Sequence, residues 1–163
     1  MVSQKDYAII AEEIVYEILK KKYKTKIHDN RNNPKKIGDF QVGKKIIEVK
    51  GEGEDYHGFK NNKSDFVARY ITVSKTEWKF LNKFPDRFEI YIVYRLNEKY
   101  YPLHPEWNYP KIVMIRGREL VKCKTEKPIV NIKTPKPFWK TKSKVQHPVP
   151  KSIWKKYSKK QVI

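Results

Sequence analysis

Two acidic residues and a lysine within residues 37–50 have the types and spacing of a metal-dependent hydrolytic site. Asp39 lies on the first of two predicted strands, which a tight turn at Gly43-Lys44 joins, and the second strand carries Glu48 and Lys50. Because side chains alternate along a strand, Glu48 and Lys50 should point to the same side. Two carboxylates and a lysine on one sheet face can hold a divalent cation and an activated water beside a phosphodiester. The segment therefore predicts a metal-dependent nuclease.

A helix that should precede this hairpin, from about Gln4 to Lys22, has Ser3 as its predicted N-cap. A helical wheel gives it one apolar face, made of Tyr7, Ile10, Ala11, Ile14 and Ile18. Glu12 lies outside the charged face of this helix, among Ile9, Tyr16 and Leu19. A carboxylate at such a position is paired, serves a site, or turns outward to solvent, and the sequence leaves these alternatives open.

The elements after the hairpin predict an α/β fold with a mixed central sheet flanked by helices. A loop over residues 51–64 leaves the end of the second strand, where substrate contacts are common. Ser74 and Glu77 form a capping box that should begin a helix reaching about Phe84. The other predicted elements are a strand or irregular segment at Phe66–Val73, strands at Phe88–Leu96 and Lys111–Ile115, and a short helix at Gly117–Val121.

Basic charge is concentrated at the end of the chain. The formal net charge is +19, and residues 122–163 hold 13 lysines, no arginine and a single acidic residue. A charge of this size attracts a polyanion, although a lysine-rich solvated surface is the alternative explanation. We divide the chain into a domain at 1–121 and a basic arm at 122–163, in which prolines should interrupt any regular element. The aromatic residues of the arm suit base stacking, or else they pack on their own domain.

The composition disfavours several other classes of protein. No run of apolar residues is long enough for a transmembrane helix, and the N-terminus lacks the apolar core of a signal peptide. The single cysteine, Cys123, can form no internal disulfide. The basic arm lacks the amphipathic helical pattern of a membrane-binding segment. We therefore expect a cytoplasmic protein with no membrane partner.

With Asp39, Glu48 and Lys50 in this order, the chain resembles the PD-(D/E)xK, or restriction-endonuclease-like, nuclease superfamily. Within it, the chain is similar to the NO VEIN C-terminal group, on the residues Ile47–Gly51 and Arg69–Trp78. The resemblance spans residues 5 to 96. The sequence departs from the pattern in two places. Gly38 replaces the proline of the motif name, and Ala8 and Ala11 replace the glycines that commonly precede the helix glutamate.

The resemblance implies a restriction-endonuclease-like core and a catalytic role for four residues. Asp39 and Glu48, with the backbone carbonyl of Val49, would bind Mg²⁺ or Mn²⁺. Lys50 would orient the attacking water and stabilise the charge of the transition state. Glu12 would be an outer-sphere residue or a ligand of a second metal. The alternative is that Glu48 and Lys50 form an ordinary ion pair at the end of a sheet, which needs no functional reason.

The expected partner is DNA, with RNA as the alternative. Candidate contacts lie in the loop after the second strand, near the second helix and in the basic arm: His57, Lys60, Arg69, Lys75, Trp139, Lys140 and Lys142. Cleavage of both strands needs two active sites, so we expect a homodimer. We expect a DNA endonuclease of the restriction, mobile-element or resolvase type. The alternatives are a non-catalytic binding protein that retains the fold, and a nuclease subunit that needs a partner.

Overall fold

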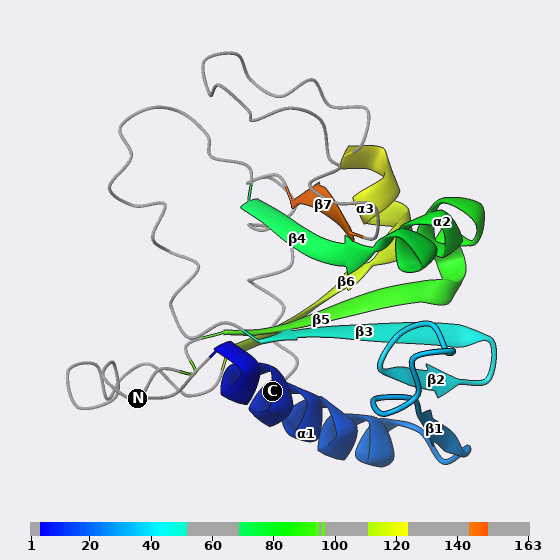
Figure 1. Cartoon of the computed structure of the whole chain (residues 1–163). Helices are drawn as coiled ribbons and strands as arrows, with labels where there is room; N and C mark the ends of the chain where they lie inside the picture. The colour runs from blue at the N-terminus through cyan, green and yellow to red at the C-terminus, as the bar shows by residue number, and fades with distance from the viewer. Residues whose placement is uncertain (1–3, 52–68, 95, 97–110, 124–143, 150–163) are drawn as a thin grey trace.

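The computed structural model of the chain describes residues 4–51, 69–94, 96, 111–123 and 144–149. One helix and one short strand precede the predicted hairpin, and the remaining elements follow it (Figure 1). In chain order the elements are α1 (Gln4–Lys22), β1 (Ile27–Asp29), β2 (Phe40–Val42), β3 (Lys45–Gly51), β4 (Arg69–Ser74), α2 (Lys75–Lys83), the 3-10 helix η2 (Pro85–Arg87), β5 (Phe88–Tyr94), β6 (Lys111–Arg116), α3 (Gly117–Cys123) and β7 (Lys144–Val149).

Five strands form the main sheet in the order β1-β2-β3-β5-β6, and β3 lies at its centre. Strands β3 and β5 run parallel, whereas the other neighbouring pairs run antiparallel. A parallel pair needs a crossover connection, and here the chain between the two strands contains β4 and α2. The predicted α/β fold with a mixed central sheet is therefore confirmed.

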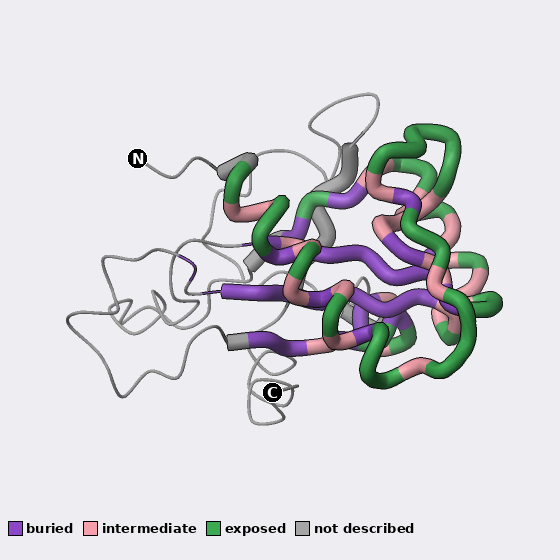
Figure 2. Tube along the Cα trace, turned by 90° about the horizontal axis from the view of Figure 1, so that it is seen from below, coloured by how far each residue is buried: buried purple, intermediate pink, exposed green. Residues whose placement is uncertain are grey.

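The main sheet is covered on both faces. Helix α1 lies on one face, and β4, β7, α2 and α3 lie over the other (Figure 1). All seven residues of β5 are buried, and the buried strands run through the middle of the molecule in Figure 2. Side chains of β5 alternate between the two cores: Tyr91 and Val93 pack with α1, whereas Ile90 and Ile92 pack with β4 and α2.

Helix α1 has the predicted bounds, but it buries a different face from the predicted one. Its fully buried residues are Ala11, Val15 and Leu19, whereas Ile10 is 37% exposed. Apolar residues occur around most of the helix, so a helical wheel does not identify the buried face. Packing on β3 determines which face is buried. The remaining members of the predicted face pack partly against the core: Tyr7, Ile14 and Ile18. The predicted N-cap, Ser3, lies outside the described residues.

Gly51, at the end of β3, allows α1 to approach the sheet closely. A Cβ atom at this position would lie 2.3 Å from the carbonyl oxygen of Tyr7 and 2.9 Å from the Cβ of Ala11. These distances leave no room for a side chain, so only glycine fits without moving the helix. The first half of α1 is thereby held against the end of β3 that carries Glu48 and Lys50.

Strand β7 contradicts the prediction that prolines interrupt every regular element after residue 122. It pairs antiparallel with β4, and Pro148 lies opposite Tyr70. Within the described residues β4 is the only neighbour of β7, and proline is tolerated on such an edge because no ladder bond needs its missing N–H. Helix α3 also crosses the predicted boundary at 121, since it reaches Cys123. Part of the basic arm therefore belongs to the folded domain.

Two further strands, β1 and β4, add to what the sequence predicts. Strand β1 was not predicted, because only Ile27 of its three residues is even partly buried, so no alternation of apolar residues marks it. The segment around Phe66–Val73, predicted as strand or irregular, contains β4. Among the described helices, none combines the length and the apolar composition needed to span a membrane.

Candidate active site

Asp39 lies directly before β2 and is fixed to β3 by two hydrogen bonds. Its backbone N–H donates to the carbonyl of Ile47 at 2.9 Å, which continues the antiparallel pairing of the two strands. Its Oδ2 atom accepts a hydrogen bond from the backbone N–H of Val49 at 2.7 Å. The carboxylate of Asp39 therefore lies beside the backbone that connects Glu48 to Lys50, as the predicted hairpin requires.

Gly38 explains why this chain has no proline before Asp39. Its φ angle is +72°, whereas the pyrrolidine ring of proline holds φ near −65°. A Cβ atom on residue 38 would also lie 2.6 Å from Cγ2 of Ile46 and 2.9 Å from the carbonyl oxygen of Ile47. Glycine is thus required by both the backbone conformation and the close packing on β3. The departure from the motif name leaves Asp39 correctly placed.

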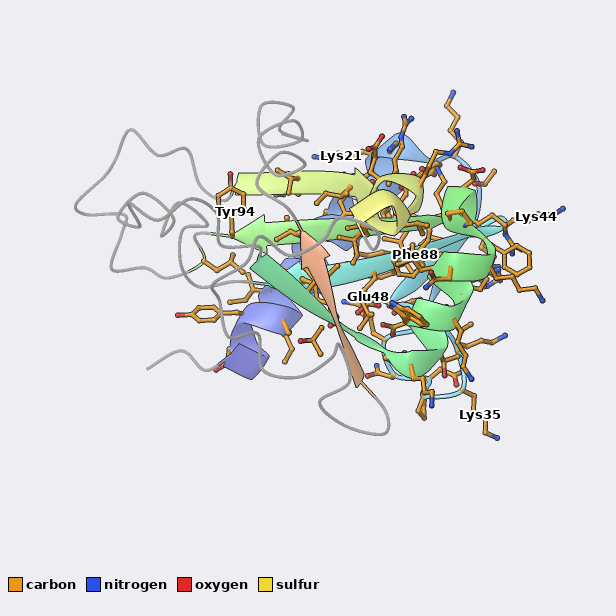
Figure 3. The ribbon with its side chains drawn as sticks, turned by 90° about the horizontal axis from the view of Figure 1, so that it is seen from above. Lys21, Lys35, Lys44, Glu48, Phe88 and Tyr94 are labelled. Carbon is orange, nitrogen blue, oxygen red and sulfur yellow. The ribbon has the colours of Figure 1, made fainter. Side chains whose placement is uncertain are left out.

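Glu48 and Lys50 lie on the same side of β3, as strand alternation predicts, and form an ion pair. Lys50 Nζ donates to Glu48 Oε1 at 2.5 Å. The side chains are 7% exposed for Glu48 and 25% exposed for Lys50. In Figure 3 Glu48 points into the molecule, whereas Lys35 and Lys44 extend outward. A buried carboxylate with one ammonium partner differs from a solvated surface pair, although Lys45 and Glu89 form a second pair of this kind.

Negative charge is crowded at this end of β3. Burial raises the pKa of Glu48 to about 8, and the nearby Asp39 and Glu77 carboxylates add to the rise against the opposing effect of Lys50. Burial also raises the pKa of Asp39, although the hydrogen bond from the Val49 N–H and the charge of Lys50 act in the opposite direction. One ammonium group is too little positive charge for these carboxylates. The site therefore favours a further cation or a shared proton.

Lys50 keeps its proton in this environment. Burial alone would lower the pKa of Lys50. The Glu48 carboxylate raises this pKa, and Glu77 and Asp39 raise it further. The net result is a raised pKa. The side chain is thus an ammonium group that donates hydrogen bonds, and in this state it is not a free base.

Glu12 faces the site from α1. Its side chain is half-buried, and burial raises its pKa, followed by the effect of the Asp39 carboxylate. Arg31 and Lys50 exert smaller opposing effects. Within the described residues Glu12 has no hydrogen bond or ion pair. The charge effects of Asp39 and Lys50 on its pKa place Glu12 near these residues.

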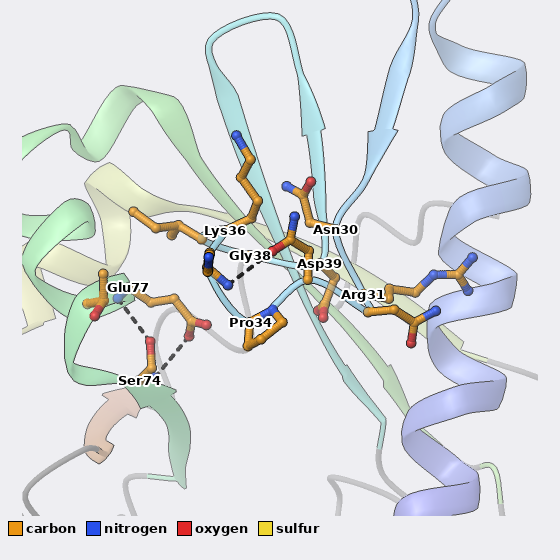
Figure 4. Close-up of a pocket in the computed structure, with 13 residues that line it drawn as sticks. Asn30, Arg31, Pro34, Lys36, Gly38, Asp39, Ser74 and Glu77 are labelled. Atoms are coloured by element: carbon orange, nitrogen blue, oxygen red, sulfur yellow. Dashed lines mark hydrogen bonds between the residues drawn. The ribbon is translucent and has the colours of Figure 1, made fainter.

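Glu77 also belongs to the site, although sequence reasoning assigned it only a capping role. The predicted capping box is present: Glu77 N–H donates to Ser74 Oγ at 3.0 Å, and Ser74 N–H donates to Glu77 Oε2 at 2.9 Å (Figure 4). The Glu77 carboxylate also raises the pKa values of Asp39 and Glu48. Its position directly after a strand, in the first turn of a helix, is the sequence signal that could have identified it.

The donor set fits a hard divalent cation in its chemistry. Asp39 and Glu48 supply oxygen atoms, which Mg²⁺ and Mn²⁺ prefer, and each carboxylate uses only one oxygen in the hydrogen bonds described above. In the described part of the chain no three histidine, cysteine or acidic side chains form a cluster able to hold a metal. Glu12 accordingly does not join Asp39 and Glu48 as a third close carboxylate. The fitting set is two carboxylates and the Val49 carbonyl.

The predicted nucleic-acid contacts remain predictions. Arg69 begins β4 and pairs through its backbone with Val149, and Lys75 begins α2, where it is exposed. The other candidates lie outside the described residues: His57, Lys60, Trp139, Lys140 and Lys142.

Comparison with known proteins identifies the family. The chain matches the family described as Protein NO VEIN, C-terminal, over residues 11–105, which is more than half of its length. The chain therefore belongs to the NO VEIN C-terminal family. The matched segment contains α1 from Ala11 onward and all the strands that form the site. Searches of curated proteins and of solved structures found no match.

Proposed function

We propose that the protein is a metal-dependent DNA endonuclease that hydrolyses phosphodiester bonds. The observation that carries the proposal is the group of Asp39, Glu48 and Lys50, in which Glu48 is buried and accepts a hydrogen bond from Lys50, and Asp39 accepts one from the Val49 N–H. Both carboxyl groups have raised pKa values, so the group lacks positive charge. The family match and the α/β fold are compatible with a nuclease-like domain. The resemblance to the PD-(D/E)xK superfamily supports the same assignment.

Each residue has a distinct role in this proposal. Asp39, Glu48 and the Val49 carbonyl would hold Mg²⁺ or Mn²⁺. The bound cation would supply a water of lowered pKa and positive charge beside the phosphate. Lys50 stays protonated and donates a hydrogen bond to a phosphate oxygen as negative charge develops there. Glu12 and Glu77 act on this group through their charges, and Glu12 orients water at the edge of the site. The net charge of +19 draws the polyanionic substrate to the protein.

Cleavage of supercoiled plasmid tests the proposal, and Lys45 provides a matched control. Lys45 and Lys50 both lie on β3, and each pairs with a buried glutamate: Lys45 with Glu89 at 2.7 Å and Lys50 with Glu48 at 2.5 Å. We expect wild type and Lys45→Ala to cut plasmid with Mg²⁺ or Mn²⁺ and to lose activity in EDTA. Lys50→Ala should lose at least ~100-fold in rate, because it removes a donor aimed at the developing charge. Equal rates for Lys50→Ala and Lys45→Ala would contradict the assigned site.

The high net charge supports a second candidate function, a non-catalytic nucleic-acid-binding protein that retains this fold. Plasmid that is retarded in a gel but stays uncut with both metals would favour this candidate, or a nuclease subunit that needs a partner. If Lys50→Ala binds plasmid within a few-fold of wild type but no longer cuts it, the result would favour the endonuclease over the binding protein.

A further inference from the structure

A pocket of about 530 Å³ opens beside Asp39 (Figure 4). One wall is the loop of residues 30–38, which connects β1 to β2, and the other wall is the start of α2 at Ser74, Thr76 and Glu77. A volume of this size is within the range of sites for small molecules. Because Asp39 forms part of the wall, whatever fills the pocket lies next to the proposed cleavage site.

Asn30 supplies an unsatisfied hydrogen-bond donor at this pocket. The residue is 8% exposed, and its side-chain nitrogen has no hydrogen-bond partner within the described residues. Its backbone N–H donates to the carbonyl of Asp39 at 2.8 Å, so its main chain is fixed beside the site. A buried amide donor without an acceptor destabilises the folded protein. Rotation of the carboxamide toward the pocket would let an acceptor on a ligand remove this cost.

Glu77 supplies an acceptor on the opposite wall. Its Oε2 atom takes the hydrogen bond from the Ser74 N–H, whereas Oε1 takes none from the described residues. A carboxylate oxygen suits an amino group, as in carboxylate recognition of the amino group of cytosine, and an asparagine amide suits the edge of adenine. Asn30 and Glu77 together therefore match a Watson–Crick edge on which an exocyclic amine lies next to a ring nitrogen that accepts, as in adenine and cytosine.

The charges and apolar surfaces of the pocket favour a base over a phosphate. Two carboxylates, Asp39 and Glu77, form part of its walls, and the arginine there, Arg31, already pairs with Asp29 and Glu13. The two carboxylates would repel a phosphate that entered between them without a metal. Pro34 and Ile37 add apolar surface that the face of a ring can cover. Lys35 and Lys36 are exposed, where they can contact the backbone phosphates on either side of the base.

We infer that this pocket binds one unpaired adenine or cytosine of the strand that is cut, an inference that rests on the proposed nuclease function. A base inside a pocket between a loop and a helix must leave its stack, so the preferred substrate is single-stranded or locally unpaired nucleic acid. Asn30 and Glu77 are the specificity-determining residues, and the Asp39 group holds the neighbouring phosphate.

Binding of mononucleotides tests the inference without any cleavage. The wild-type chain, labelled with ¹⁵N and free of divalent metal, is titrated with dAMP, dCMP, dTMP and deoxyribose 5-phosphate, and the side-chain amide signals of Asn30 are followed. We expect saturable shifts with dAMP or dCMP, at concentrations ~10-fold lower than with dTMP or deoxyribose 5-phosphate. Equal binding of all four probes would indicate a phosphate site and overturn the inference. Absence of any shift at Asn30 would also overturn it.

Two variants separate base recognition from a loss of folding. Glu77→Gln keeps an oxygen atom that accepts from the Ser74 N–H and removes the negative charge. Its control is Glu119→Gln, which lies in the first turn of α3 and does not line this pocket. Glu77→Gln should lower the preference for dAMP or dCMP ~10-fold, whereas Glu119→Gln should leave it unchanged. Asn30→Ala should lower the preference for dAMP or dCMP as Glu77→Gln does. This result counts only if the melting temperature of Asn30→Ala stays near that of wild type. An unchanged preference in Glu77→Gln would contradict the inference.

Cleavage supplies the second arm of the test. An active enzyme should cut a single strand or a bubble at least ~10-fold faster than the matched duplex, next to adenine or cytosine. The two proposals fail separately. If the protein binds dAMP or dCMP in the pocket but cuts nothing, the base-binding inference stands and the nuclease proposal fails. If it cuts duplex and single strand equally at every base, the nuclease proposal stands and the base-binding inference fails.

Discussion

At the scale of single residues, the site is one buried carboxyl group, Glu48, with partly buried carboxyl groups and one ammonium group near it. Glu48 is 6% exposed, and its only hydrogen bond within the described residues comes from Lys50. Burial of a charged carboxylate is costly unless it is neutralised. Burial raises the pKa of Glu48 to about 8, so this carboxyl takes up a proton more readily than an ordinary glutamate when no cation is bound. A divalent cation would displace this proton, so metal affinity should rise with pH.

The raised pKa of Glu48 predicts how stability depends on pH in the metal-free protein. The pKa of Glu48 is about 8 in the folded protein and 4.5 for an ordinary glutamate, so between these pH values the folded state binds one more proton than the unfolded state. This stabilisation is complete below pH 4.5 and is lost as the pH rises through 8. From pH 5.5 to 8.5 the free energy of unfolding should fall by on the order of 2 kcal/mol more in wild type than in Glu48→Gln. Urea unfolding in EDTA measures both proteins, and parallel pH profiles would contradict the raised pKa.

Gly38 predicts a difference between two glycine substitutions in the same hairpin. Gly38 and Gly43 both have positive φ, but a Cβ on Gly38 meets Ile46 and Ile47, whereas a Cβ on Gly43 has nothing within 4 Å. Gly43→Ala should cost about 1 kcal/mol for its backbone conformation alone. Gly38→Ala should cost about 1–3 kcal/mol more, because the added carbon overpacks the contact with β3. Chemical denaturation measures both, and equal losses would show that packing does not require glycine before Asp39.

At the scale of elements, local sequence signals predicted most of the structure. The bounds of α1 followed from its apolar period, and the α2 start followed from the Ser74–Glu77 capping box. The hairpin followed from the turn at Gly43 and the alternation of β3, which also placed Glu48 and Lys50 on one side. These features depend on residues close together in sequence, and a single chain contains that information.

The features that sequence reasoning missed depend on distant contacts. Burial of Val15 and Leu19 in place of Ile10 is decided by the shape of the sheet that α1 covers. The effect of Glu77 on Asp39 arises only when β4 and α2 are folded over β3. Strand β7 forms because β4 offers it an edge, and its own proline argued against it. Packing between segments far apart in sequence produces all three, so no local pattern marks them.

The pairing of β7 with β4 predicts that the basic arm contributes to stability through β7. A chain ending at Val149 keeps all six residue pairs of this two-stranded sheet, whereas a chain ending at Cys123 loses them all. The longer truncation should lower the melting temperature by several degrees, because β4 loses the only strand with which it pairs in the described part of the chain. The shorter truncation should change it little. Equal melting temperatures for full-length protein and the chain ending at Cys123 would contradict the pairing.

At the scale of the whole molecule, the excess of positive charge should set the affinity for nucleic acid. Residues 150–163 contain five lysines and no acidic residue, so the chain ending at Val149 lacks these charges. If these lysines contact phosphates, the slope of log affinity against log salt concentration should decrease in magnitude by up to about 4. Fluorescence anisotropy with a labelled oligonucleotide at several salt concentrations measures the slope. Identical slopes would show that this segment contacts no phosphates.

The most direct test of the central claim compares Asp39→Ala with wild type in one Mg²⁺-dependent plasmid-cleavage assay, with plasmid binding measured in parallel. Asp39 is the residue that the hairpin register and the hydrogen bond from Val49 place beside Glu48 and Lys50. We predict that Asp39→Ala binds plasmid within a few-fold of wild type and cuts it at least ~100-fold more slowly. Cleavage by Asp39→Ala at the wild-type rate would contradict a metal-dependent active site at this position.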